Sequence, residues 1–293
     1  YLWDKQFIAL LSVIHANGTT SRFTTAVSGE PVSGAPAMGA PANRLLFTAG
    51  AGPVTYDDIF DGEAYDARIG AAISGWDTCS PAAAAAQWEP AVKPRMSPAD
   101  HGAQMSSHTL HTHVMRDYSV ATAGGITEPI PGVFVFKFAQ NMAGIVTLRV
   151  RGCNAGRVIR LQFAETLWAA NQTIHNQFPG GNRPGGMARM LANYTCAGGS
   201  AEEVYRTQFT SFGYQFVQVE NYPGVPMADA LQAHFIGPDF KPAGEFSSSS
   251  AVLNAIQRSI VASAAANWAN DVVSTQAIHP LLVNSRSFLR DCL

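Results

Sequence analysis

The segment VTLRVRGCNAGRVIRLQF, residues 146–163, decides the fold. In its first half, apolar residues at positions 146, 148 and 150 alternate with polar ones, and Ile159, Leu161 and Phe163 repeat the pattern in the second half. A period of two is typical of strands that bury one face. Because the glycine-bearing stretch 152–156 separates the two runs, they predict an antiparallel hairpin.

Further strands flank this segment on both sides. The runs 214–220 and 230–236 follow it, and near the N-terminus the run 7–15 leads into Asn17-Gly18, a pair typical of tight turns. No helical period separates the strands between residues 111 and 238. This region therefore predicts an antiparallel β-sandwich.

Two proline-bearing stretches divide the chain. Residues 28–43 predict an exposed loop, and residues 93–105 predict a domain boundary. A chain of 293 residues is long enough for two domains of ordinary size. We therefore predict one β-sandwich at 1–92 and a second at 106–238.

The hydrophobic period changes after Gly244. Apolar residues then recur every four positions, at Val252, Ile256, Ile260, Ala264, Trp268 and Val272. Preceded by the hydroxyls of residues 247–250, this pattern predicts one amphipathic helix of about six turns. An apolar stripe of that length needs a partner, yet residues 275–293 have no sustained period. Residues 244–293 thus predict the truncated start of a helical domain.

Composition restricts the partners. A net charge of −2 without a basic stretch disfavours nucleic acid and anionic membranes, and the longest apolar run, 7–14, is too short to span a bilayer. The four cysteines, Cys79, Cys153, Cys196 and Cys292, are widely spaced and include no Cys-x-x-Cys pair. They predict neither a zinc site nor a disulfide framework. The sequence does not identify a compartment.

Acidic residues are the first candidates for chemistry, because glycoside hydrolysis uses two carboxyl groups. They cluster at Asp57, Asp58, Asp61, Glu63 and Asp66. Aspartate and glycine together also build turns, so we interpret the cluster as structural, with Glu63 and Asp66 near Arg68 in a hydrogen-bonded network. Glu165, at the end of an alternating run, has the same interpretation. We assign no catalytic residue.

Histidines raise the question of a metal. His111 and His113 would share one face of a strand, with His108 close by. Because no suitably spaced third ligand accompanies them, we predict no metal site and no cofactor.

Aromatic rings offer a second route to sugar binding, since a ring face packs against the apolar face of a pyranose. Trp76, Trp88 and Trp168 are candidates, with core packing as the alternative for each. The glycine-rich stretch 178–189 predicts a flexible loop in which Arg183 or Arg189 is a candidate donor of hydrogen bonds to a ligand. We take Trp76, Trp168 and Arg183 as the carbohydrate-binding candidates.

Four segments occur in a specific order along the chain. They are DIFDGEAYDARI (58–69), PGVFVFKFAQNMAGIVTLRVRG (131–152), LQFAETL (161–167) with FTSFGYQFVQV (209–219), and GEFSSSSAVLNAI (244–256). Together they resemble the bacterial-type α-L-rhamnosidases of glycoside hydrolase family 78. In the second segment Gln140, Asn141 and Gly144 match the family, whereas Lys137 and Ala139 stand where it has aspartate and glycine.

The resemblance implies jelly-roll or concanavalin-like sandwiches followed by the first helix of an (α/α)6 barrel. It implies a parent activity of inverting hydrolysis of terminal α-L-rhamnose, with rhamnose-containing glycosides or polysaccharide as partners. The sequence diverges from the family near Thr275, and the family's catalytic carboxylates have no matching positions. We expect an accessory, non-catalytic portion; a carbohydrate-binding module and a structural remnant are the alternatives.

Overall fold

The computed structural model describes residues 10–24, 48–49, 52–58, 61–75, 89–90, 113–121, 124–174, 189–238 and 243–267. Contacts divide the chain into two compact units. The first unit consists of Tyr1–Gly52 with Ala72–His108, and the second of Pro53–Ala71 with Thr109–Leu293. The candidate loop 28–43 and the connector 93–105 lie outside the described residues.

The first unit contains two short antiparallel pairs. Strand β1 (Leu10–Ile14) pairs with β2 (Thr20–Thr24), and the turn between them holds Gly18 at φ 81°, a conformation that glycine adopts without strain. The strand and turn predicted around residues 7–18 are thereby confirmed. Strand β3 (Thr48–Ala49) pairs with β6 (Glu89–Pro90).

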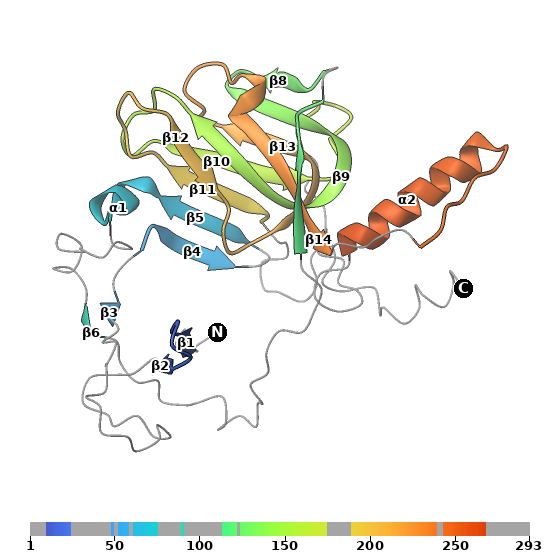
Figure 1. Cartoon of the computed structure of the whole chain (residues 1–293). Coiled ribbons are helices and arrows are strands. Elements are labelled where there is room, and N and C mark those ends of the chain that lie inside the picture. Colours follow the sequence, from blue (N-terminus) through green and yellow to red (C-terminus); the bar gives the residue numbers. More distant parts are fainter. Residues whose placement is uncertain are drawn as a thin grey trace, which may run out of the picture. The chain divides into compact units, whose positions relative to one another are not determined.

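The second unit is built on one curled sheet of ten strands (Figure 1). Its main path runs β4 (Val54–Asp58), β5 (Gly62–Asp66), β11 (Leu191–Thr195), β10 (Val158–Ala164), β13 (Phe212–Glu220), β9 (Val133–Val150), β14 (Leu231–Pro238) and β7 (His113–Tyr118). Strands β8 (Ile126–Ile130) and β12 (Glu203–Arg206) pair with β9 beside this path. The short helix α1 (Ala67–Ala72) follows β5, and the 3-10 turn η3 (Ala228–Ala230) precedes β14. The chain is mostly β, as predicted.

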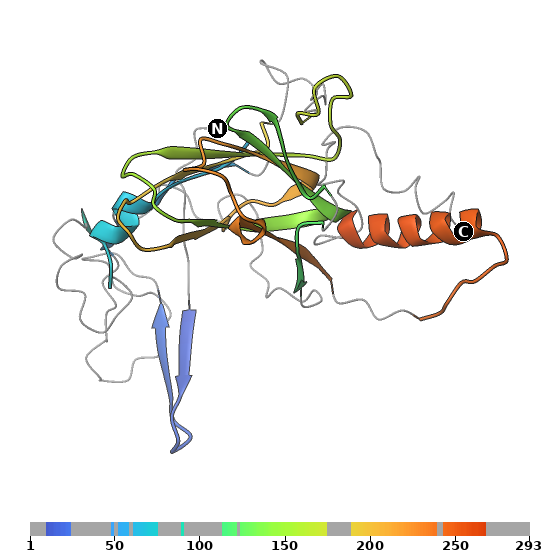
Figure 2. The ribbon, with the colours of Figure 1, turned by 90° about the horizontal axis from the view of Figure 1, so that it is seen from above.

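Strand β9 links the two layers of this sheet. Its first half pairs with β8 and with most of β13, whereas its second half pairs with β12 and β14. Figure 2 shows the resulting layers from a second direction. The apolar core contains Phe134, Phe136 and Phe138 of β9, and the rings of Phe163 and Phe212 stack with their centroids 3.8 Å apart. Burial of such large rings is a main source of stability for a sandwich.

The prediction that residues 146–163 form an antiparallel hairpin is wrong. The alternation was read correctly, because residues 146, 148, 150, 159, 161 and 163 are all buried. However, β10 pairs with β11 and β13 and not with β9. Period-two alternation identifies the buried face of a strand but does not name its neighbour, and here the chain passes from one layer to the other between the two runs.

The cysteine prediction is also wrong. Cys153 and Cys196 form a disulfide, with Cα atoms 6.1 Å apart. The antiparallel pairing of β10 with β11 explains the contact, since the backbone N–H of Cys196 donates to the carbonyl of Arg157 just beyond the last strand pair. Linear spacing of the cysteines concealed this proximity, because 43 residues separate them in sequence.

The strand β5 enters the second unit by a parallel pairing with β11, in register from Gly62 opposite Leu191 to Asp66 opposite Thr195. A Cβ atom at Gly62 would lie 1.8 Å from the carbonyl oxygen of Leu191, so only glycine fits there. Residues Pro53–Ala71 accordingly belong to the second unit. The division into domains at 1–92, 106–238 and 244–293 stays a prediction.

The C-terminal helix α2 (Ala251–Asn267) forms where its period predicted it. Ser250 caps it, because the backbone N–H of Leu253 donates to the Ser250 hydroxyl at 3.4 Å. Ala265 and Ala266, near the end of the helix, pack against the core. Trp268 and Val272, the last two positions of the predicted stripe, lie outside the described residues. In the part of the chain that is described, no helix is both long and apolar enough to cross a membrane.

Candidate functional site

Glu63 is the most buried member of the acidic cluster, with 1% of its surface exposed. Its Oε1 accepts a 2.8 Å hydrogen bond from the hydroxyl of Tyr205, and its Oε2 accepts from the backbone N–H groups of Gln208 and Phe209 at 3.0 and 2.9 Å. A buried carboxylate with three donors is a stable structural arrangement. Both of its oxygens accept hydrogen bonds from protein donors, which agrees with the structural role that we predicted.

Asp66 and Arg68 form a local ion pair and not a buried network. The Arg68 guanidinium donates to both Asp66 oxygens, at 3.0 and 2.7 Å, and these hydrogen bonds lower the pKa of Asp66. More than half of the Arg68 side chain is exposed, so this pair contributes little to stability. Tyr65 packs its ring against those of Tyr194 and Tyr205.

Among the described acids, Glu165 has the environment that most resembles that of a general acid. Burial raises its pKa, while a hydrogen bond from Asn141 opposes the shift. A raised pKa alone does not make a glycosidase, because the chemistry requires a second carboxyl group on the other side of the scissile bond. Glu165 therefore remains a single candidate without an assigned partner.

Among the predicted sugar-binding residues, the structure describes only Trp168. It is 41% exposed and begins the tight turn 168–173. Trp76, Trp88, Arg183 and residues 178–188 of the predicted loop lie outside the described residues, as do His108 and His111. Arg189, the last residue of that loop, is described, and its backbone N–H donates to Oδ1 of Asp61 at 3.3 Å. Within the described ranges, no group of three histidine, cysteine, aspartate or glutamate side chains is arranged to hold a metal ion.

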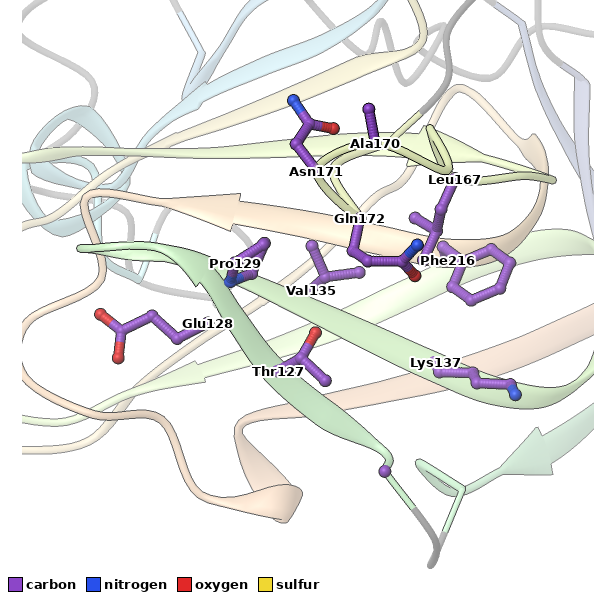
Figure 3. A pocket seen from close by; sticks show the side chains of 11 residues that line it. Thr127, Glu128, Pro129, Val135, Lys137, Leu167, Ala170, Asn171, Gln172 and Phe216 are labelled. Atoms are coloured by element: carbon purple, nitrogen blue, oxygen red, sulfur yellow. The ribbon is translucent and has the colours of Figure 1, made fainter.

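A groove lies beside the turn that carries Trp168, on the outer face of the sheet (Figure 3). Its volume is about 640 Å³, within the range of sites for small molecules. Strands β8, β9 and β13 and the segment 167–172 supply its lining. The lining includes Thr127, Val135, Lys137, Leu167, Gln172 and Phe216.

The floor of the groove follows from strand register. Phe216 pairs with Lys137 and Thr127 pairs with Val135, so side chains from three adjacent strands emerge on one face. Their neighbours Phe134, Phe136 and Val217 point the other way, into the core. Figure 3 shows the Phe216 ring beside Leu167, with the Gln172 amide directed toward them.

The wall of the groove is a hydrogen-bonded turn. Within it, the N–H of Gln172 donates to the Trp168 carbonyl, and the N–H of Trp168 donates to the Thr173 carbonyl, both at 2.8 Å. Gln172 has φ 56°, the left-handed region that non-glycine residues rarely occupy. The backbone N–H of Ile174 donates to Oε1 of the buried Gln218 at 3.3 Å, which fixes the turn to β13. The wall is therefore preorganised.

Sequence reasoning missed this groove. Phe216 and Gln172 carry no motif of their own, and Lys137 was noted only as a departure from the family pattern. The available signal was the alternation in 209–219, which places Phe216 and Gln218 on the face opposite Val217 and Val219. That pattern gives the face, but the neighbouring turn 167–174 comes from tertiary structure.

Comparison with known proteins now decides the relationship. Residues 127–237 match the family model described as the bacterial alpha-L-rhamnosidase concanavalin-like domain. The chain is related to the bacterial α-L-rhamnosidases. It is 29% identical over 259 residues to an alpha-L-rhamnosidase of Streptomyces avermitilis and 24% identical over 206 residues to one of Formosa agariphila. These matches cover 86% and 69% of this chain but only 21% and 20% of the relatives. The rhamnosidase-related chain thus spans about a fifth of their length.

Solved structures agree with this relationship. The Streptomyces avermitilis alpha-L-rhamnosidase complexed with L-rhamnose matches with a TM-score of 0.72 and 26% identity, over 92% of this chain and 23% of that one. The alpha-L-rhamnosidase of Aspergillus terreus matches with a TM-score of 0.69 and 21% identity, over 89% of this chain and 26% of that one, and shows the shared fold. The resemblance read from the four motifs is confirmed, including its restriction to part of a rhamnosidase.

Proposed function

We propose that this chain is an accessory, non-catalytic portion of an α-L-rhamnosidase, whose whole-protein activity is hydrolysis of terminal α-L-rhamnose with inversion. The observation that carries the proposal is that the carboxylate of Glu63 is held by hydrogen bonds within the protein. The strongest acidic motif of the sequence has its most buried carboxylate occupied by three protein donors. A catalytic carboxylate must instead face the glycosidic bond or the attacking water.

The match to curated relatives supports the same proposal. Both relatives are named alpha-L-rhamnosidase, and this chain aligns with only about a fifth of each. Substrates of the whole protein would be rhamnose-containing glycosides or polysaccharide. In this proposal the chain contributes the fold that accompanies the catalytic domain and not the reacting groups.

The test is hydrolysis of an aryl α-L-rhamnoside by the purified 293-residue chain. We expect no release of the aryl group above that of a mock purification, whereas a complete relative assayed in parallel releases it. Release that follows the purified chain and disappears in Glu165→Gln would contradict the proposal and would identify Glu165 as a catalytic acid.

A second function, saccharide binding without catalysis, is favoured by the groove beside the turn 167–174. It combines apolar side chains with amide and hydroxyl groups on a preorganised frame. This combination is what recognition of an uncharged, ring-shaped ligand requires.

A further inference from the structure

We propose that the groove binds a neutral deoxy-sugar ring, with the apolar edge of the ring against Phe216 and Leu167 and its hydroxyl groups toward Gln172 and Thr127. This inference rests on the saccharide-binding function proposed above and names the surface that performs it.

The apolar floor is fixed before any ligand arrives. Val135 is held in β9 between β8 and β13 and is 2% exposed, so it supports the floor from beneath and leaves Phe216 and Leu167 as the apolar contact surface. Phe216 is half-buried on the same face and supplies a ring. A methyl group or the C–H face of a sugar gains by leaving water for such a surface.

The polar groups sit on a rigid wall above this floor. The amide nitrogen of Gln172 donates to the Ala169 carbonyl at 3.1 Å, which holds the side chain in the turn and leaves its Oε1 as an acceptor for a ligand hydroxyl. Asn171 is also held in the turn, because its Oδ1 accepts hydrogen bonds from the backbone N–H and the hydroxyl of Thr173. Rare backbone conformations such as that of Gln172 persist where surrounding contacts enforce them, and they cluster at sites that clamp ligands.

The charges of the lining favour an uncharged ligand. Among the described residues that line the groove, Lys137 and Glu128 alone carry a full charge, and their signs cancel. Glu128 also accepts the N–H of Gly132 at 2.7 Å, which ties it to the turn after β8. A phosphate or nucleotide would call for several cations or a row of backbone N–H groups, and the lining presents one ammonium. A saccharide needs none.

The experiment is a titration of the whole chain, labelled with nitrogen-15, with L-rhamnose and separately with L-mannose, followed by amide chemical shifts. L-mannose differs only in carrying a hydroxyl on C6, where L-rhamnose has a methyl group. We expect saturable shifts at residues 127, 135, 137, 172 and 216, and about fourfold weaker binding of L-mannose because its polar C6 arm meets the apolar floor.

Variants locate the site. Phe216→Leu keeps an apolar floor but removes the ring, and Gln172→Gly keeps the left-handed backbone but removes the amide. We expect each to weaken L-rhamnose binding about tenfold. The matched control is Phe209→Ala, an aromatic side chain 66% exposed and outside the groove, which leaves affinity unchanged.

The proposal is overturned if no saturable shift occurs, if the shifts map away from the groove, or if both groove variants bind as the unaltered chain does. An amide spectrum with the original dispersion shows that each variant is folded. Hydrolysis of the aryl rhamnoside is measured on the same preparation. Hydrolysis contradicts the non-catalytic role without affecting the groove, whereas absence of binding contradicts the groove alone.

Discussion

The carboxylate of Glu63 accepts a 2.8 Å hydrogen bond from the hydroxyl of Tyr205, which is 142 residues away in sequence. This bond, together with those from Gln208 and Phe209, ties β5 to the segment after β12. A motif that reads as a candidate active site is therefore part of the frame of the second unit.

Replacement of Glu63 tests this structural role. Glu63→Ala leaves three donors without their acceptor, and we expect the free energy of unfolding to fall by about 3 kcal/mol. Glu63→Gln retains one carbonyl oxygen, so its loss is about 1 kcal/mol. Denaturant unfolding measures both. Glu202→Gln, which removes an exposed pair with Arg151, serves as the control and changes stability by about 0.5 kcal/mol or less. Equal losses in Glu63→Ala and Glu202→Gln would refute the role.

Buried tyrosines predict instability in alkali. Burial raises the pKa of Tyr194, Tyr205 and Tyr214, and the neighbouring carboxylates Glu203 and Glu63 raise the first two further. Below the unfolded pKa of about 10, both states keep the phenol protons and this contribution is fully present. As the pH rises further, the unfolded chain ionises first, so stability falls by about 1.4 kcal/mol per pH unit for each tyrosine.

The measurement is unfolding at a series of pH values, with tyrosinate absorbance as the probe. Tyr214→Phe removes one of the protons that the folded chain retains, so the slope above the unfolded pKa becomes shallower by about 1.4 kcal/mol per pH unit. At neutral pH the same variant loses about 1 kcal/mol, because its hydroxyl no longer donates to the Ile145 carbonyl. An unchanged slope would mean that Tyr214 ionises as freely in the folded chain as in the unfolded one.

The disulfide between Cys153 and Cys196 predicts a dependence on reductant. Closing a loop of 43 residues restricts the unfolded chain, and the loop-entropy model gives about 4 kcal/mol of stabilisation. We expect dithiothreitol to lower the unfolding midpoint of the chain and to leave the double variant Cys153→Ala/Cys196→Ala unaffected. Peptide mapping without reduction should recover the two cysteines in one linked fragment. Recovery of both as free thiols would show that the bond does not form.

The apolar side of α2 predicts self-association. Val252 and Val261 are 67% and 56% exposed, and Leu253 and Ile256 are about half exposed. Exposed apolar patches of this kind promote aggregation. Ile256→Lys combined with Val252→Glu should lower the scattering of concentrated samples, whereas Arg258→Gln on the same helix should not. Equal scattering from the unaltered chain, the double variant and Arg258→Gln would show that the surface responsible for self-association is not the apolar side of α2.

Much of the fold was predictable because local patterns decide it. Alternation identified the buried faces of β10 and of the second half of β9, and the four-residue period with its serine cap identified α2. The family relationship was also readable, since motif order survives when single positions change. These signals lie within short stretches of chain.

The partners of the strands, and the contacts between residues far apart in sequence, were not predictable from local patterns. The partner of β10 depends on which strands the fold places beside it. The bond between Cys153 and Cys196, which are 43 residues apart in sequence, depends on the pairing of β10 with β11. The groove combines Phe216, Lys137 and Gln172 from three separate segments. Glu63 was the exception: its structural role followed from the turn-building character of the surrounding aspartates and glycine.

The parallel pairing of β5 with β11 has a consequence for how the second unit assembles. Residues 62–66 can pair only when residues 191–195 are available. The intervening sequence includes residues 72–108, which belong to the other unit. Such non-local contacts raise contact order and slow folding. A fragment begun at residue 106 would lack β4 and β5 and leave β11 as an unprotected edge, open to pairing between copies. Folding intermediates in which residues 53–71 have not yet docked would carry the same edge, so refolding yield should fall as protein concentration rises.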